Sequence, residues 1–186
     1  MRLSENRVLA WGMLAVCVLG SVVGLGGASL VRERNALSNV FYDGVESQDT
    51  GRYSMDAYLD RAAECAQVMA AEAQLYLGND CAAAADMLET LGGFGDDDTL
   101  DMRYSAYTQL QKDSDALYNA MYAAELSDAE RVNFKRAYDD FWGSDKYIRK
   151  DPYREMASEF NDRLKGFPAG AVAAIMGVEE MSSFGA

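Results

Sequence analysis

The chain of 186 residues contains no histidine, only two prolines and only three cysteines. Without histidine there is no Ser–His or Cys–His catalytic pair, no HExxH zinc site and no ExxH di-iron site of the kind that helical bundles hold. Two cysteines outside the apolar run, without histidine, make a poor ligand set, so we expect no metal ion and no cofactor. The scarcity of proline and the abundance of Ala, Met, Leu, Tyr and Glu favour helix.

Basic residues are scarce as well, since 17 Lys and Arg stand against 30 Asp and Glu, for a net charge of −13. The first 34 residues carry four Arg against Glu5 and Glu33, so the acidic excess lies entirely in the remainder. An acidic surface of this size repels phosphate backbones, and nucleic acid is therefore not an expected partner. The polar remainder is long enough for one domain with its own core.

One long stretch, residues 8–31, carries no charge and is bounded by Arg7 and Arg32. As a helix at about 1.5 Å per residue it reaches roughly 36 Å, and the hydrocarbon core of a bilayer is about 30 Å thick. We therefore predict a short flank over residues 1–7, a transmembrane helix over residues 8–31, and a single-pass membrane protein with the lipid bilayer as a partner.

Two other interpretations of this run remain open. The run is longer than the roughly 7–15 apolar residues of a secretory signal, but the small residues ending at Ala28 resemble a cleavage site. Cleavage there would release a secreted, soluble helical bundle beginning at Ser29. Residues 14–17 resemble a lipobox, although Val16 is bulky where a small residue is required. Two Arg lie on each side of the run, so the positive-inside rule does not fix the side of the domain.

Gly20, Gly24 and Ala28 lie four residues apart, on one face of the predicted membrane helix. Small residues at this spacing allow two membrane helices to approach closely. Glycine is also frequent in membrane helices that do not associate. Self-association through this face is therefore one hypothesis. The alternative is that these small residues have no role in association.

Beyond the apolar run the spacing of apolar residues predicts several helices joined by short turns. The clearest begins after Ser54 as N-cap and ends at Gly78-Asn79. A short helix follows over residues 81–91. The next, over residues 99–125, is expected to be capped by Asp97 or Asp98. Its apolar seam consists of Leu100, Tyr107, Leu110, Leu117, Met121 and Ala124.

The best-defined boundary is the capping box Ser127-Asp128-Ala129-Glu130, which starts a helix at Asp128. Gly143-Ser144 interrupts the pattern, and Asp151-Pro152 interrupts it again, so we expect a kink or short break between Trp142 and Pro152. The predicted fold is all-α, an N-terminal transmembrane helix followed by an antiparallel up-and-down helical bundle over residues 32–166.

The closing segment, residues 167–186, contains an apolar run over residues 169–178 that is too short to cross a bilayer. We expect this segment to pack on the bundle or on the membrane surface. A set of aromatic, Asn, Pro and Gly residues surrounds it, with Tyr153 seven residues before an aromatic-Asn pair. The set comprises Tyr153, Phe160, Asn161, Phe167, Pro168, Gly177 and Phe184.

In the order and spacing of these motif residues the chain resembles the LemA family of bacterial membrane-anchored helical proteins. The match is closest over residues 153–184, and Asn35-Ala36-Leu37 matches in part. Residues 58–61 (Tyr-Leu-Asp-Arg) replace the family's Ile-Pro-Asn-Leu-Val motif, and Glu179-Glu180 replaces a common Lys-Pro. These departures indicate a divergent member.

The resemblance implies a membrane helix followed by a long antiparallel bundle, no known catalytic activity, and a role in organising membranes or assemblies. The expected function is therefore a non-enzymatic interaction or scaffold module in a bacterial cell membrane, with a protein partner or a second copy. We expect the motif residues to be structural. The ring of Phe167 should be buried at a helix stop, Asn161 should hold the chain reversal by hydrogen bonding, and Gly177 should cap a helix or permit a close approach.

A carboxylate-based enzyme, or one using Ser with Lys, is the rival interpretation, and it requires a polar pocket inside the bundle. Cys65 and Cys81 lie 16 residues apart, with one turn of the chain between them. A disulfide between them is therefore geometrically feasible, but nothing in the sequence requires it. The acidic cluster of residues 96–98 and Asp101 lacks the spacing of an EF-hand, which favours helix capping over calcium binding.

Overall fold

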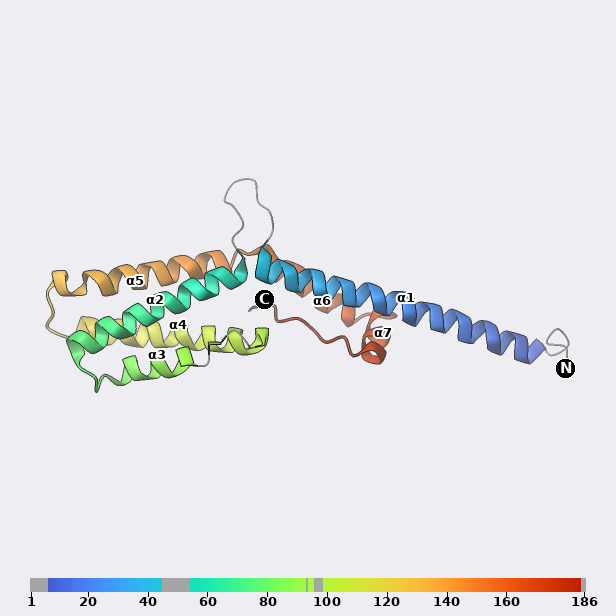
Figure 1. Ribbon diagram of the computed structural model, residues 1–186, viewed down its shortest axis with the longest axis horizontal. Helices are drawn as coiled ribbons and strands as arrows, with labels where there is room; N and C mark the ends of the chain where they lie inside the picture. Colours follow the sequence, from blue (N-terminus) through green and yellow to red (C-terminus); the bar gives the residue numbers. More distant parts are fainter. Residues whose placement is uncertain (1–6, 45–53, 93, 96–98, 185–186) are drawn as a thin grey trace. The chain divides into compact units, whose positions relative to one another are not determined.

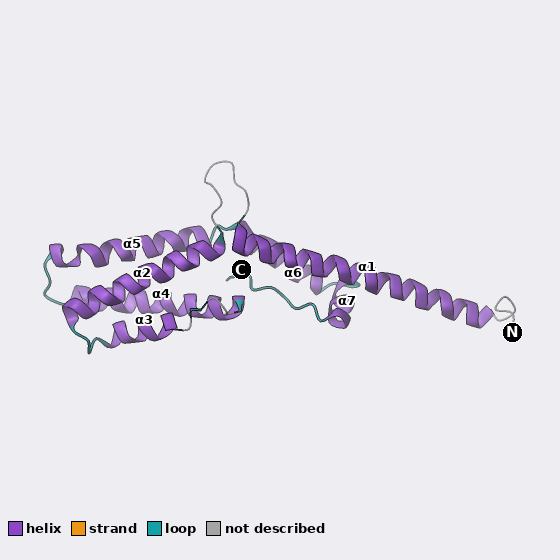
Figure 2. Ribbon diagram, viewed as in Figure 1, coloured by secondary structure: helices purple, strands orange, loops and turns teal. Residues whose placement is uncertain are grey.

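The computed structural model describes residues 7–44, 54–92, 94–95 and 99–184, and over these residues it is all-helical, as predicted (Figures 1 and 2). The helices are α1 (Arg7–Asp43), α2 (Met55–Leu77), α3 (Ala82–Gly92), α4 (Leu100–Ala123), α5 (Asp128–Ile148), α6 (Pro152–Leu164) and α7 (Ala169–Met176). Of the predicted flank 1–7 only Arg7 is described, and of the closing segment the last two residues lie outside the described residues.

The chain forms two compact units, and α1 and α6 each contribute to both. The long-helix unit comprises residues 1–39 and 155–181, and the four-helix unit comprises residues 40–154 and 182–186. The predicted bundle domain, residues 32–166, includes parts of both units.

In the four-helix unit α2 is the central helix, since it packs most extensively on α5 and also contacts α3 and α4. Consecutive helices run in opposite directions, so the arrangement is up-and-down (Figure 1). The seam side chains that are fully buried include Leu59, Ala62, Ala66 and Met69 of α2, Leu110, Leu117 and Met121 of α4, and Phe134 and Phe141 of α5. Burial of such side chains, at roughly 25 cal/mol per Å², supplies the stability that short isolated helices lack.

Side-chain caps determine where these helices begin. Ser54 Oγ accepts a hydrogen bond from Ala57 N at 3.1 Å, as predicted for α2. The capping box of α5 is complete, because Ser127 Oγ accepts from Glu130 N at 3.3 Å and Glu130 Oε2 accepts from Ser127 N at 2.8 Å.

The N-cap of α4 differs from the prediction. The cap is Thr99, whose Oγ1 accepts from Met102 N at 3.3 Å. The predicted caps, Asp97 and Asp98, lie outside the described residues. A threonine directly before the first helical residue satisfies the same orphan N–H group that a carboxylate would, so the earlier aspartates are not needed for the cap.

The predicted break before Pro152 is confirmed, because α5 ends at Ile148 and α6 begins at Pro152. Asp151 caps the new helix, since its carboxylate accepts from Tyr153 N at 2.9 Å. The predicted interruption at Gly143-Ser144 is wrong. Ser144 is buried inside α5 and its hydroxyl donates to the Asp140 carbonyl at 3.2 Å, so the helix continues through this pair.

α1 continues without interruption past the apolar run and ends at Asp43. It is long and apolar enough to cross a membrane, a property that a signal sequence shares. In the long-helix unit, α6 from Glu155 onward and the whole of α7 lie beside α1 (Figure 1).

We predict that Ser127→Ala lowers the free energy of unfolding by about 1 kcal/mol, because it removes the side-chain half of the capping box. Denaturant titration of the full-length chain in detergent, followed by circular dichroism, measures the change. Ser105→Ala, at an exposed position inside α4, is the matched control and should shift the value by less than about 0.5 kcal/mol. Equal behaviour of the two variants would contradict a stabilising role for the cap.

Candidate functional site

The most extensive candidate site is the apolar surface of α1. The large apolar side chains of α1 that are exposed are Trp11, Met13, Leu14, Val16, Val18, Leu19, Val22, Leu25 and Val31. Trp11 is 70% exposed and Leu25 is 76% exposed, so the described part of the chain leaves them almost uncovered. Monomeric soluble proteins rarely expose a continuous apolar surface of this length, which is typical of a contact site for lipid or for a partner.

Gly20, Gly24 and Ala28 lie on this open surface. A Cβ atom built on Gly20 or Gly24 meets no described atom within 4 Å. The face is therefore accessible to a second helix, and self-association through it stays a prediction.

The adjacent face of α1 is the one that α7 covers. A Cβ atom on Gly26 would lie 3.7 Å from Val172 Cγ1, and one on Gly27 would lie only 2.6 Å from Met176 Cγ. Glycine at position 27 thus permits the Met176 side chain to approach the backbone of α1 closely. With a larger residue there, Met176 would have to shift away. Val172 and its neighbour Ala173 are buried in this contact.

A groove of about 480 Å³ opens between α1 and the turn that joins α6 to α7. Its walls are mostly apolar and include Val22, Leu30, Phe167 and Val172. An ion pair between Glu33 of α1 and Arg163 of α6 also lines this groove. The groove is therefore an apolar surface with one charged pair at its border.

Within the long-helix unit, Asn161 binds the returning chain as predicted. Its Nδ2 donates to Met181 O at 2.7 Å and its Oδ1 accepts from Met181 N at 2.8 Å, and both bonds are buried. Gly177 ends α7 in the left-handed conformation, with φ of 66°. Phe160 is fully buried in the same unit. Asn161 is therefore a fold determinant that satisfies both backbone groups of one residue.

The predicted burial of Phe167 is wrong, because its ring is 93% exposed. Phe167 lies in the turn between α6 and α7, next to Pro168, and the contact with α1 is made by Val172 and Ala173 instead. A large aromatic ring left open at a turn is unusual for a structural residue, since aromatic rings contribute most when buried.

In the four-helix unit, the remaining motif residues form part of the aromatic core. Tyr153 is fully buried and its hydroxyl donates to Ser182 O at 2.9 Å. The ring of Phe184 lies 5.0 Å from that of Tyr104 and 5.5 Å from that of Phe41. These contacts anchor the last described residues of the chain.

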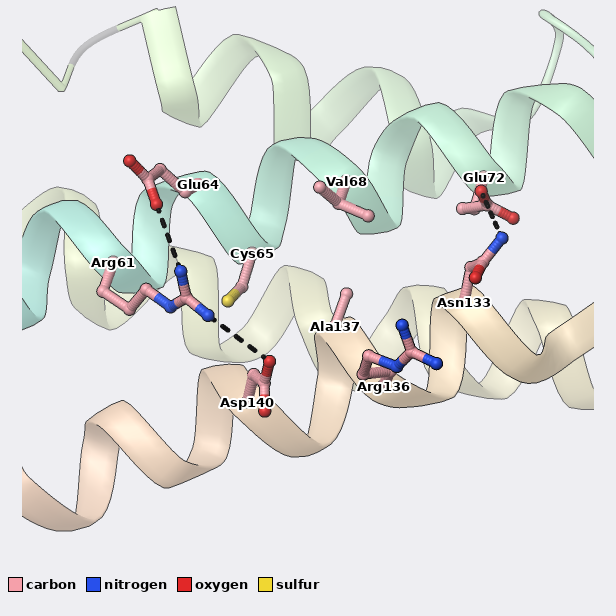
Figure 3. A pocket seen from close by; sticks show the side chains of 9 residues that line it. All are labelled: Arg61, Glu64, Cys65, Val68, Glu72, Asn133, Arg136, Ala137 and Asp140. Atoms are coloured by element: carbon pink, nitrogen blue, oxygen red, sulfur yellow. Dashed lines mark hydrogen bonds and ion pairs between the residues drawn. The ribbon is translucent and has the colours of Figure 1, made fainter.

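A groove of about 280 Å³, lined largely by polar and charged side chains, lies on the surface between α2 and α5 (Figure 3). Arg61 lies between Glu64 at 3.6 Å and Asp140 at 3.5 Å. These ion pairs are exposed and therefore contribute little to stability. Cys65 lies in the same groove, and burial raises the pKa of its thiol, so the nucleophilic thiolate is disfavoured at neutral pH. Cys65 and Cys81 are free thiols.

A buried polar cluster inside the four-helix unit was not foreseen from the sequence. Asp145 of α5 accepts three hydrogen bonds of 2.6 Å, from Tyr107 Oη, Gln111 Nε2 and Arg149 Nε. Burial and the neighbouring Asp145 raise the pKa of Tyr107 far above its ordinary value. The hydroxyl of Tyr107 is therefore fixed as a donor.

A second buried cluster joins α4 to α2. Arg103 is only 5% exposed and pairs with Asp56 and Asp60, one turn apart on α2. Its guanidinium carbon lies 5.2 Å from the centre of the Phe94 ring. A cation held in this way is stabilised by two carboxylates and by the face of an aromatic ring.

The cluster around Asp145 leaves little room for a substrate. A general base needs a free lone pair that substrate can approach, and three donors already occupy the carboxylate of Asp145. The opening beside it measures about 120 Å³, below the 300–1,000 Å³ that is typical of small-molecule sites. Among the described residues, no group of three His, Cys, Asp or Glu side chains is placed to hold a metal ion.

Comparison of the chain with models of protein families, with curated proteins and with solved structures returned no match. The candidate sites are therefore defined by the geometry of this chain alone. Among them, the uncovered surface of α1 with the adjoining α7 is the largest.

We predict that Asn161→Ala lowers the free energy of unfolding by about 2–4 kcal/mol, because it leaves the N–H and C=O groups of Met181 buried without partners. Amide hydrogen exchange on the full-length chain should show faster exchange at residues 178–184. Asn133→Ala, which removes one exposed 3.4 Å bond to Glu72, is the matched control. Unchanged exchange in the Asn161 variant would show that the tail is held by other contacts.

We predict that Tyr107→Phe costs about 1–2 kcal/mol at neutral pH, because Asp145 loses one of its three donors. The unfolded tyrosine releases its proton near its ordinary pKa of 10.0, whereas the folded one keeps it. Unfolding therefore becomes easier as the pH rises above 10, by about 1.4 kcal/mol per pH unit from this group.

Denaturation of both chains between pH 9 and about pH 11, limits that bracket the ordinary tyrosine pKa, measures the difference. The variant should lose less stability than the unaltered protein over this interval. Tyr147→Phe, which removes an exposed hydroxyl, should follow the unaltered protein. Parallel curves for all three would contradict the raised pKa of Tyr107.

Proposed function

We propose that the protein is a membrane-anchored, non-enzymatic module of LemA-like type, which presents a helical domain for contact with a protein partner or a second copy. The observation that carries the proposal is the apolar surface of α1 between Trp11 and Leu25, which the described residues leave uncovered. The division of the chain into two compact units supports the other part of the proposal, a helical domain that accompanies the membrane helix.

The magnitude of the exposed apolar surface favours lipid as its environment. Burying one large apolar side chain is worth about 1.5–3 kcal/mol, and nine such side chains are exposed along α1. Their transfer out of water is thus worth on the order of 10–25 kcal/mol. That is comparable with or larger than the 5–15 kcal/mol that usually holds a whole domain together.

The contacts of α7 favour an uncleaved helix over a secretory signal. Cleavage after Ala28 would remove Gly26 and Gly27, which lie against Val172 and Met176. Residues just beyond that position, Leu30 and Glu33, belong to the same packed surface. A signal that is discarded has no reason to be packed against residues on both sides of its cleavage position.

The buried polar clusters favour a contact role over catalysis. Asp145 already accepts three hydrogen bonds, and Arg103 already pairs with two carboxylates, all from side chains of the four-helix unit. The charged groups that stay accessible, such as those of the α2–α5 groove, are suited to electrostatic recognition of another protein. The contacts of Asn161 and Phe184 support the LemA-like interpretation, because the motif residues hold the chain end.

Alkaline carbonate extraction of bacterial membranes, with mass spectrometry of the purified chain, tests the anchor. We expect the protein in the membrane pellet with residues 8–31 intact. Val16→Arg with Leu19→Arg should release it, because each Arg at the centre of a membrane helix costs about 2.5–3.5 kcal/mol. Val132→Arg, at an exposed site on α5, is the control and should stay in the pellet.

A mature chain that begins at Ser29, or an intact chain that carbonate extracts, would overturn the anchor. Chemical cross-linking in the same membranes tests the contact role. Discrete adducts, either with twice the mass of the chain or with one recurrent protein, are expected. Anchored protein that forms no discrete adduct would overturn the contact role and leave the anchor standing.

A further inference from the structure

We infer that α7, with the turn that precedes it, is a second membrane-contact element that lies in the boundary between lipid headgroups and acyl chains beside α1. This inference rests on the proposed anchoring of α1. It assigns the lipid bilayer, and not a protein, as the occupant of the exposed side of α7.

The first observation is that α7 is apolar on every side. Its sequence, Ala-Gly-Ala-Val-Ala-Ala-Ile-Met, contains no polar side chain. Val172 and Met176 lie against α1, while Ile175 is 67% exposed. A helix on a water-facing surface normally carries polar side chains on its outer face. An apolar outer face is expected where that face meets lipid.

The second observation is the position of Phe167. Its exposed ring borders the same groove as Val22 of α1 and Val172 of α7. Val22 lies within the apolar run, nine residues before its end at Val31. The groove extends from Val22, inside the apolar run, to Glu33, beyond it, and our inference places the open ring of Phe167 among the acyl chains near Val22. There an aromatic side chain is stabilised by the same burial that it lacks in water.

The third observation is the depth at which α7 crosses α1. Val172 and Met176 lie over Gly26 and Gly27, four to five residues before Val31. At about 1.5 Å per residue, α7 lies roughly 6–8 Å below the end of the apolar run. Helices that lie in the plane of a membrane bury their apolar face about 5–10 Å into the boundary region. The two depths agree.

The charges around α7 fit the same placement. Arg163 and Lys165 precede the apolar turn, and Glu179 follows α7. Long basic side chains can keep their charge in the headgroup layer while their stems lie along apolar surface. Glu33, the partner of Arg163, lies two residues beyond the apolar run, on its polar side. The Glu33–Arg163 ion pair thus lies beyond the end of the apolar run, where a headgroup layer would be.

Fluorescence quenching by brominated lipid tests the placement in the full-length chain. The chain has two tryptophans, Trp11 and Trp142. Both are replaced by Phe, and one tryptophan is then introduced as Phe167→Trp or Ile175→Trp, at sites exposed enough to accept it. Each protein is reconstituted into phosphatidylcholine–phosphatidylglycerol vesicles with and without lipid brominated along the acyl chain.

We expect brominated lipid to remove as large a fraction of the emission at positions 167 and 175 as it removes from a chain that retains Trp11 alone. Val132→Trp, on the exposed face of α5, is the matched control in the same background and should lose no emission. Circular dichroism of every variant verifies that the helices are retained.

The outcomes separate the two proposals. If brominated lipid does not quench the emission of Trp11, the membrane anchor itself is overturned. Quenching at Trp11 with water-like, unquenched emission at positions 167 and 175 would overturn the placement of α7 alone. Unquenched but blue-shifted emission at these two positions would overturn it in favour of a second protein copy covering α7.

Discussion

A helix surface that water solvates poorly, and that the described chain leaves uncovered, constrains this protein more than any other feature. Among the described residues of α1, the exposed large apolar ones begin at Trp11, and those that lie against α7 begin at Gly26. The change from one to the other occurs inside the uncharged run and not at its end. The uncharged run of α1 therefore has two roles. One part of its surface packs within the long-helix unit, and another part is open to lipid or to a partner.

The four-helix unit combines an apolar seam with buried ionic and polar clusters. Arg103 of α4 meets two aspartates of α2, and Tyr107 of the same helix meets Asp145 of α5. Removing such groups from water costs roughly what their mutual attraction returns. We interpret them as devices that select which helices pair and in which register, while the apolar seam supplies most of the stability.

Helix positions were predictable where local chemistry determines them. Ser54, the Ser127 capping box and Pro152 each satisfy or remove a backbone donor at a helix start, and this effect needs no knowledge of the fold. The polar clusters were missed although a signal exists. Arg103 and Ser114 continue the three-four spacing of Leu100, Tyr107 and Leu110, so polar residues occupy seam positions. Their partners come from other helices, which one-dimensional spacing cannot supply. The open ring of Phe167 was unpredictable for the same reason.

The pairing of α7 with α1 joins two helices that lie far apart in the sequence. Gly26 is synthesised long before Val172, and ribosomes add about 5–20 residues per second, so the α7-binding face of α1 waits roughly 7–30 s for its cover. Until then the nascent chain holds only part of its final structure, and a chaperone or insertion factor has time to occupy that face. The face of α1 at Gly26 and Gly27 is therefore covered only after α7 has been synthesised, and a ribosome stalled before Val172 would leave it open.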